Sequence, residues 1–152
     1  MAHARLVSFL LGRERTLTVR YLLVATGLFI FTLGLWGLVY VINTYDLIWP
    51  IRNLGLLVGV FAAVSIGSAA VQAYQNHGLL VSWALGSAIP LGLYIVPTAS
   101  SVMPPDETVL WGIWSGLMFG IPLGTLGFAL GVAIHRAVLI RENRRYGTNA
   151  ST

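Results

Sequence analysis

The sequence predicts an all-α integral membrane protein, a bundle of four transmembrane helices that forms a single membrane domain over residues 1–152. Only 9% of the residues are charged and 57% are hydrophobic, whereas a soluble domain carries about a quarter charged residues. Charged residues are also missing from three long stretches, which lie between Arg20 and Asp46, Arg52 and Asp106, and Glu107 and Arg136. Because a charge in the bilayer core costs several kcal/mol, these stretches are predicted to lie in a membrane.

Four predicted spans follow from the lengths of these apolar stretches. A helix needs about 20 apolar residues to cross roughly 30 Å of hydrocarbon. The stretch from Arg52 to Asp106 is too long for one crossing, so we divide it into two spans joined by a short turn at residues 75–78. Pro97 is expected to end the second of these spans. The four spans therefore cover about 19–42, 51–74, 79–96 and 109–134.

The distribution of arginine predicts the orientation of the bundle. Eight of the nine Arg residues flank the first and last spans, and the loop before the last span carries two acids and no base. Because positively charged flanks stay on the cytoplasmic side, we expect both tails, residues 1–18 and 135–152, to be cytoplasmic in a multi-pass protein of the plasma membrane. The arginines expected to set this topology and to contact lipid headgroups are Arg13, Arg15, Arg20, Arg136, Arg141, Arg144 and Arg145.

Small residues recur at every fourth position in two of the spans and form two glycine ridges, a glycine-zipper pattern. Residues four apart share one helix face, so each ridge leaves a groove in which another backbone can approach closely. The ridges consist of Gly55, Gly59, Ala63 and Gly67 in the second span and of Gly112, Gly116, Gly120 and Gly124 in the fourth. These two helices are expected to run in the same direction. The ridges could therefore pack against each other within the chain, or at least one of them could bind another protein chain.

Two prolines, Pro90 and Pro122, lie near the middle of the third and fourth spans and are hinge candidates. Each removes one backbone hydrogen bond and bends its helix. Both stand in the string Ile-Pro-Leu-Gly, and interrupted helices at matching mid-membrane positions can mark a transporter binding site. No wider repeat accompanies the two strings, so we favour local kinks.

Side chains suited to catalysis or to holding a cofactor are missing from the interiors of the predicted spans. The chain has no Cys, and the span interiors contain hydroxyl groups but no acid or base. His77 and His135 are expected at the cytoplasmic ends of their helices and could approach each other, but a metal site requires three or four ligands. We therefore expect solvated histidines, no catalytic residue, no metal and no cofactor. The arginines lie at the chain ends rather than on one polar face, so no nucleic-acid partner is expected.

The spans offer small-residue faces for helix packing but few reactive side chains. This combination predicts a small non-enzymatic membrane protein, an accessory or scaffold subunit that assembles through its glycine ridges. Its expected partners are the lipid bilayer and either a second copy of the chain or another membrane protein. The alternative is a homo-oligomeric channel or transporter for a small or weakly polar solute, lined by hydroxyl groups and backbone carbonyls. Leucine at Gly116 and Gly120 should break assembly under either hypothesis, whereas Ser115→Ala or Thr125→Val should matter only if solute passes there.

Overall fold

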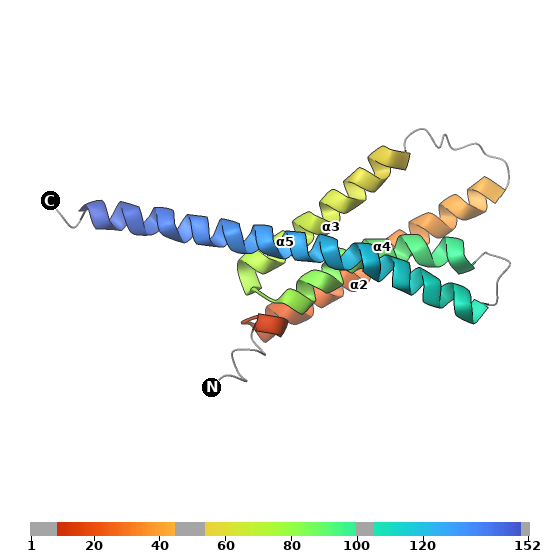
Figure 1. The fold of residues 1–152 in the computed structure, drawn as a ribbon, viewed down its shortest axis with the longest axis horizontal. Coiled ribbons are helices and arrows are strands. Elements are labelled where there is room, and N and C mark those ends of the chain that lie inside the picture. Colours follow the sequence, from red (N-terminus) through yellow and green to blue (C-terminus); the bar gives the residue numbers. More distant parts are fainter. Residues whose placement is uncertain (1–8, 45–53, 100–104, 150–152) are drawn as a thin grey trace.

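The computed structural model describes residues 9–44, 54–99 and 105–149, and within these ranges the regular structure is helical. Figure 1 shows the four helices in chain order. They are α2 (Arg15–Thr44), α3 (Leu54–Asn76), α4 (Leu79–Ala99) and α5 (Pro105–Asn149). One further helical turn, at residues 9–11, precedes α2.

Three of the helices are long and apolar enough to cross a membrane. Their apolar stretches are Phe9–Val39, Val58–Asn76 and Thr108–Glu142, and a shorter apolar helix covers Leu79–Ile95. The outer surface agrees with this assignment, since the large side chains of Leu23, Leu110 and Met118 are each at least 66% exposed. Side chains of this kind face lipid without cost but would promote aggregation in water. The chain is therefore a small multi-pass membrane protein.

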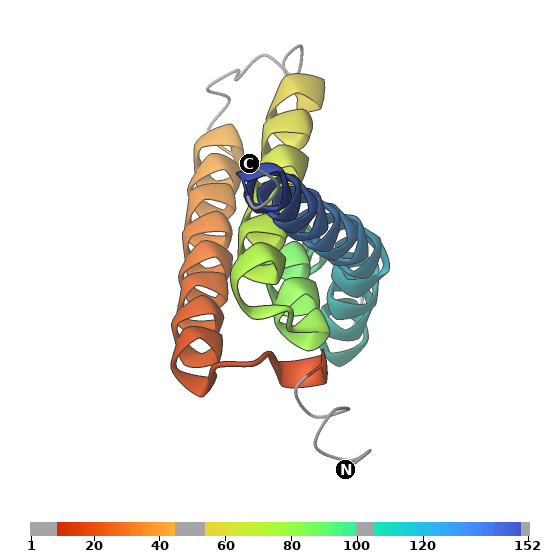
Figure 2. The ribbon, with the colours of Figure 1, turned by 90° about the vertical axis from the view of Figure 1, so that its left-hand side faces the viewer.

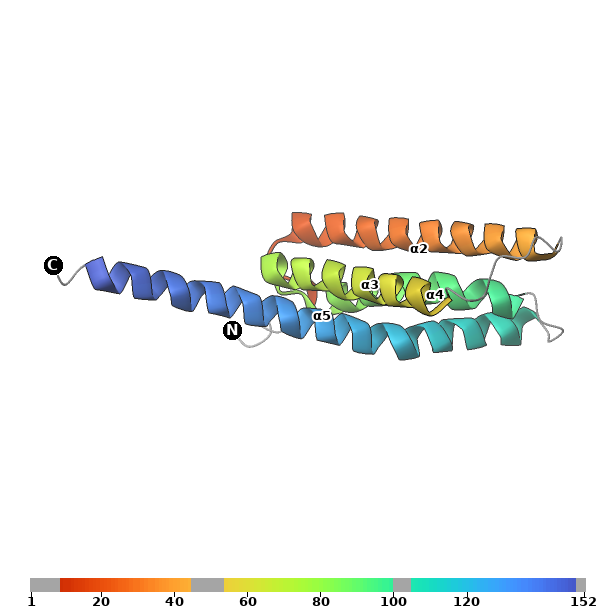
Figure 3. The ribbon, with the colours of Figure 1, turned by 90° about the horizontal axis from the view of Figure 1, so that it is seen from above.

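Helix α4 is the centre of the bundle. It packs most extensively on α5, then on α2 and α3, whereas α2 and α3 hardly contact each other. Accordingly, α2 and α5 lie on opposite sides of the bundle with α3 and α4 between them (Figure 3). The core consists of small and medium side chains, among them Leu85, Val81 and Ala88 of α4, Ala25 of α2 and Ala69 of α3. Small core residues allow the helix backbones to approach closely.

Helix α2 is attached to the bundle by a narrow seam. Over residues 15–39, where burial is described, its buried residues are Thr18, Ala25 and Thr32, which repeat every seven positions and so fall on one face of the helix. Seen along the long axis of the molecule, α2 stands on one side of the other helices (Figure 2). Most of the remaining surface of α2 is free to contact lipid or protein.

The four helices extend beyond the predicted spans, α5 by the greatest length. Helix α5 continues from the predicted span 109–134 through the region predicted as a tail, and it projects past the other helices (Figure 1). Helix α4 runs through Pro97 and ends at Ala99, so the prediction that Pro97 ends the helix is wrong. In the last turn this proline removes only one backbone hydrogen bond, which the helix tolerates for two more residues.

Candidate functional site

The glycine ridge of α5, formed by Gly112, Gly116, Gly120 and Gly124, is covered by α4. A methyl group placed on Gly116 would lie 2.8 Å from the Cα atom of Leu91, and one on Gly124 would lie 2.6 Å from the carbonyl oxygen of Ser82. On Gly120 it would overlap Ser87. Gly112, one step further along this ridge, is buried as well. The groove is therefore occupied by the backbone of a neighbouring helix in the same chain.

The partner residue on α4 is Gly86, which the analysis of the sequence did not single out. A methyl group on Gly86 would lie 2.5 Å from the Cα atom of Gly124 and 2.7 Å from the carbonyl oxygen of Gly120. Both neighbours are backbone atoms and cannot move aside as a flexible side chain would. The signal was present in the sequence, since Ser82, Gly86 and Pro90 are spaced by four residues.

Where their surroundings are described, the two ridges do not pack against each other. Helix α5 does contact α3, but through Gly127 and Gly131, which lie against Ala69, Ala70 and Ala73. Of the α3 ridge, Gly59, Ala63 and Gly67 face outward, whereas for Gly55 only the position in the helix is described. Among the described residues, no atom comes within 4 Å of a methyl group placed on Gly59 or Gly67, and Ala63 between them is exposed. The α3 ridge is thus an open groove on the outside of the bundle.

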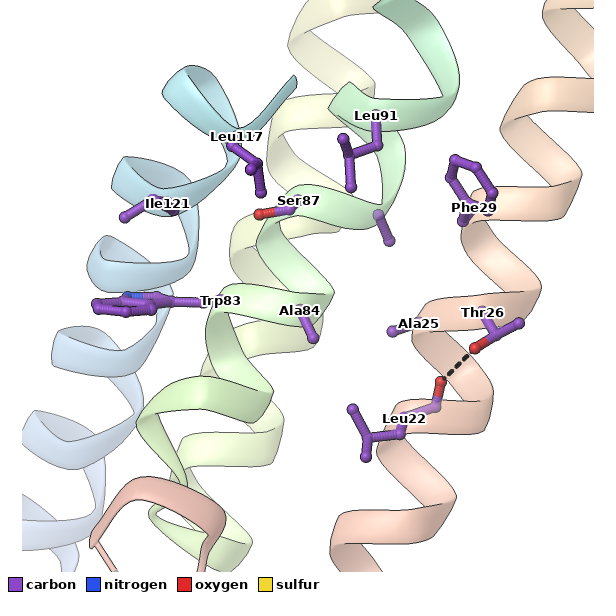
Figure 4. Close-up of a pocket in the computed structure, with 11 residues that line it drawn as sticks. Leu22, Ala25, Thr26, Phe29, Trp83, Ala84, Ser87, Leu91, Leu117 and Ile121 are labelled. Atoms are coloured by element: carbon purple, nitrogen blue, oxygen red, sulfur yellow. Dashed lines mark hydrogen bonds between the residues drawn. The ribbon is translucent and has the colours of Figure 1, made fainter. Parts of the chain in front are cut away.

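An apolar groove of about 580 Å³ lies between α2, α4 and α5. Figure 4 shows Leu22 and Phe29 of α2 facing Ala84 and Leu91 of α4 across this groove. Polar atoms contribute little to its walls. Trp83, which also lines the groove, donates from Nε1 to Thr125 Oγ1 at 3.0 Å, and Thr125 donates to the carbonyl of Ile121 at 2.8 Å. The Thr125 hydroxyl therefore holds two helices together.

The hinge candidates occupy different environments. Pro90 is buried inside α4, whereas Pro122 is exposed in α5 between two glycines of the ridge. Helix α5 is visibly bent in Figure 3, and a proline inside a helix is a sufficient cause of a bend. The other hydroxyl considered above, Ser115, is half-buried.

Asn76, the last residue of α3, joins three segments of the chain at the end of the bundle where α2 begins. Its Oδ1 accepts from the backbone N–H of Glu14 at 2.7 Å, and its Nδ2 donates to the carbonyl of Glu14 at 3.2 Å and to Thr18 Oγ1 at 2.9 Å. Its own carbonyl accepts from the N–H of Arg13 at 3.0 Å. The side chain is fully buried, so water cannot replace these bonds.

Gln72 lies one turn before Asn76 on the same buried face of α3. Its Oε1 accepts from Ser82 Oγ at 2.6 Å, but Nε2 has no hydrogen-bond partner among the described residues. Ser82 also donates to the carbonyl of Gly78 at 3.1 Å. The other buried polar atom without a partner in this part of the chain is Ser65 Oγ, two turns before Gln72. An unpaired buried polar group costs about 1–3 kcal/mol.

Because the Asn76 amide is fully hydrogen-bonded and the Gln72 amide is not, we expect replacement by leucine to cost much less stability at Gln72 than at Asn76. Gln72→Leu removes the unpaired Nε2 together with the one hydrogen bond of Oε1, and Ser82 keeps its bond to the carbonyl of Gly78. Because the gain and the loss nearly cancel, we expect the free energy of unfolding to change by less than about 1 kcal/mol in either direction. The measurement is thermal unfolding in detergent, followed by circular dichroism. A loss of more than about 3 kcal/mol would mean that Nε2 has a partner that the contacts above do not include.

His77 and His135 meet at the same end of the bundle. Their ring centroids are 4.6 Å apart with the planes nearly perpendicular, and Tyr74 contacts the His135 ring at 5.3 Å. His77 has a positive φ of 55°, a conformation that is uncommon outside glycine and asparagine. Burial lowers the pKa of His77, and the positive fields of His135 and Arg13 lower it further. Among the described residues no group of three or more potential metal ligands occurs.

The arginines predicted to contact headgroups lie toward the same end of the bundle as these histidines, around the beginning of α2 and in the later part of α5 (Figure 1). Arg13, Arg15 and Arg20 belong to the beginning of the chain and Arg136 and Arg141 to the end of α5, and all five are exposed. For Arg144 and Arg145 the position in α5 is described, but their surroundings are not. One end of the bundle therefore carries the buried amides of Asn76 and Gln72, the histidine pair and the basic side chains.

The chain matches no protein family, no curated protein and no solved structure.

Proposed function

We propose that this protein is a small non-enzymatic subunit of a membrane assembly, an accessory or scaffold component that binds its partner through the outer face of α3. One observation carries the proposal. Of the two glycine ridges, the one in α5 is occupied by α4, while Gly59 and Gly67 of the other have no neighbour within 4 Å among the described residues.

An open ridge favours a protein partner over lipid for a physical reason. Glycine in a helix interior costs about 1 kcal/mol relative to alanine, and lipid chains pack against any apolar side chain. A row of small residues is useful where a second backbone approaches closely. The α3 ridge is bordered by exposed valines that could form the walls of such a contact: Val58, Val60, Val64 and Val71.

The topology proposed for this subunit has four spans with both ends in the cytoplasm of the plasma membrane. The 21 residues of α4 would extend about 31 Å at 1.5 Å per residue, enough to cross the hydrocarbon core. The beginning of α2 and the turn after α3 lie together, since Glu14 is bonded to Asn76. An even number of crossings and the positive-inside rule are both consistent with a basic end that faces the cytoplasm.

The proposal predicts the behaviour of two matched glycine variants. Gly67→Leu should fill the α3 ridge and reduce the assembled fraction at least about tenfold, equivalent to about 1.4 kcal/mol. Gly34→Leu is the control, because Gly34 also faces open space, but on α2. The measurement is the mass of the particle extracted from the native membrane under mild conditions. Equal masses for both variants and the unaltered protein would contradict assembly through α3.

A homo-oligomeric channel or transporter for a small or weakly polar solute is the second candidate. The observation that favours it is the pair of buried polar atoms, Ser65 Oγ and Gln72 Nε2, that lack partners among the described residues. Both lie on the buried face of α3. The same mass measurement separates the candidates, since different subunits in the particle support the accessory role and identical subunits support the second candidate.

A further inference from the structure

The segment before α2, residues 9–14, crosses the end of the bundle, and we call it the N-terminal strap. It begins against α5, where the rings of Phe9 and Phe128 meet edge to face at 5.8 Å. It ends at Glu14, which is bonded to Asn76. Between these points it passes over the turn that joins α3 to α4. The strap thus connects α5, α3 and the start of α2.

The strap and the turn after α3 each have a glycine at the point where they meet. Gly12 has a positive φ of 97°, and a methyl group on it would lie 2.6 Å from Cγ of Asn76. Across from it, a methyl group on Gly78 would lie 3.0 Å from the nitrogen of Gly12. Gly12 has no room for a side chain, and a side chain at Gly78 would require its neighbours to move by a few tenths of an ångström. The strap and the turn are therefore in direct backbone contact.

The histidine pair lies beside this contact. His77 stands in the turn itself, between Asn76 and Gly78. The groups that face it are His135 from α5 and Arg13 from the strap, both of which act on it as positive charges, while Tyr74 of α3 contacts the other ring. Burial and both of these charged neighbours lower the pKa of His77. Protonation of His77 would therefore add a positive charge next to the guanidinium of Arg13.

We propose that the N-terminal strap is a pH-sensitive latch, closed when His77 is neutral and released when His77 takes up a proton. In the closed state, the imidazolium of His77 would lie 4.6 Å, centroid to centroid, from the ring of His135 and would also face the guanidinium of Arg13. Opening the strap removes Arg13 from this cluster and gives the rings access to water. Like charges at this separation repel, although water and salt reduce the effect.

The direction of the pH effect follows from which state binds protons more tightly. Burial and the two positive neighbours lower the pKa of His77 below its usual 6.5 in the closed state. Opening relieves part of both effects, so the open strap binds the proton more tightly. Linkage then requires the closed state to be fully stable above about pH 6.5 and to lose stability as the pH falls below that value.

The test is amide hydrogen exchange at Arg13 and Glu14, whose N–H groups are both bonded to Asn76. After correction for the intrinsic effect of pH on exchange, we expect their protection to fall at least about fivefold between about pH 7.5 and about pH 5.5. Amides in the middle of α4 serve as the internal reference and should keep their protection. Protection at Arg13 and Glu14 that does not change with pH would overturn the proposal.

A double variant assigns the effect to the two histidines. His77→Asn preserves a side chain that tolerates a positive φ, and His135→Gln preserves an amide of similar polarity. Together they should abolish the pH dependence and leave the protection at about pH 7.5 intact. If the pH dependence persisted in the double variant, another group would be the switch and the proposal would be wrong. If His77→Asn lowered the protection at neutral pH, His135→Gln alone would still have to reduce the pH dependence.

Discussion

Gly86→Ala is expected to destabilise the bundle by about 3 kcal/mol, a large effect for the addition of one methyl group. The new Cβ atom would lie 2.5 Å from Gly124 Cα and 2.7 Å from the carbonyl oxygen of Gly120. Because both atoms belong to the backbone of α5, the two helices must separate along their most extensive contact. The free energy of unfolding in detergent measures the effect.

Gly67→Ala is the matched control for this prediction. No described atom lies within 4 Å of its new Cβ, and alanine is the better helix former by about 1 kcal/mol. We therefore expect unchanged or slightly increased stability of the isolated protein. Equal effects of the two substitutions would show that α4 and α5 do not meet at Gly86.

Asn76→Leu is expected to release the N-terminal strap and to lower the free energy of unfolding by about 2–4 kcal/mol. Leucine has a similar volume but cannot make the three side-chain hydrogen bonds that join Asn76 to Glu14 and Thr18. The N–H of Glu14 would lose its acceptor. Hydrogen exchange should show the loss of protection at Glu14 first, because the strap can open without unfolding the helices.

Gln75→Leu, one residue earlier, is the control for Asn76→Leu. It removes an exposed bond in which Tyr21 donates from its hydroxyl to Gln75 Oε1 at 2.7 Å. Exposed bonds of this kind are replaced by water, so the expected loss is below about 1 kcal/mol. If Gln75→Leu cost as much as Asn76→Leu, burial of the amide would not be what makes Asn76 important.

The helices could be predicted from the sequence because a bilayer leaves few alternatives. Long uncharged stretches such as the one between Glu107 and Arg136 must be helical when they cross a membrane, since every backbone group needs an internal hydrogen bond. The described helices therefore contain the predicted spans apart from residues 51–53, which lie outside the described part of the chain. The spacing of small residues likewise marks which helix faces permit close packing.

The pairing of the faces could not be predicted in the same way. Small residues at every fourth position identify a groove but do not show which helix packs into it. The ridge of α5 packs against α4 around Gly86 and not against the ridge of α3. The buried hydrogen bonds of Asn76 and Gln72 could not be predicted from the sequence either. Asn76 stands in a run of polar residues that is typical of an ordinary turn. Nothing in the neighbouring sequence indicates that residues 9–14 pack over it. Such contacts depend on residues about 60 positions apart, for which a single sequence carries no signal.

The most direct test of assembly through α3 is photocross-linking from its outer face in the intact membrane. A photoreactive phenylalanine analogue replaces Val64, which borders the α3 ridge and is exposed, and the control position is Ile30, an exposed residue of α2. We expect a discrete protein adduct from position 64 and lipid adducts alone from position 30. The adduct itself would identify the partner as a second copy or a different subunit. Lipid adducts alone from both positions would show that the outer face of α3 does not bind a protein partner.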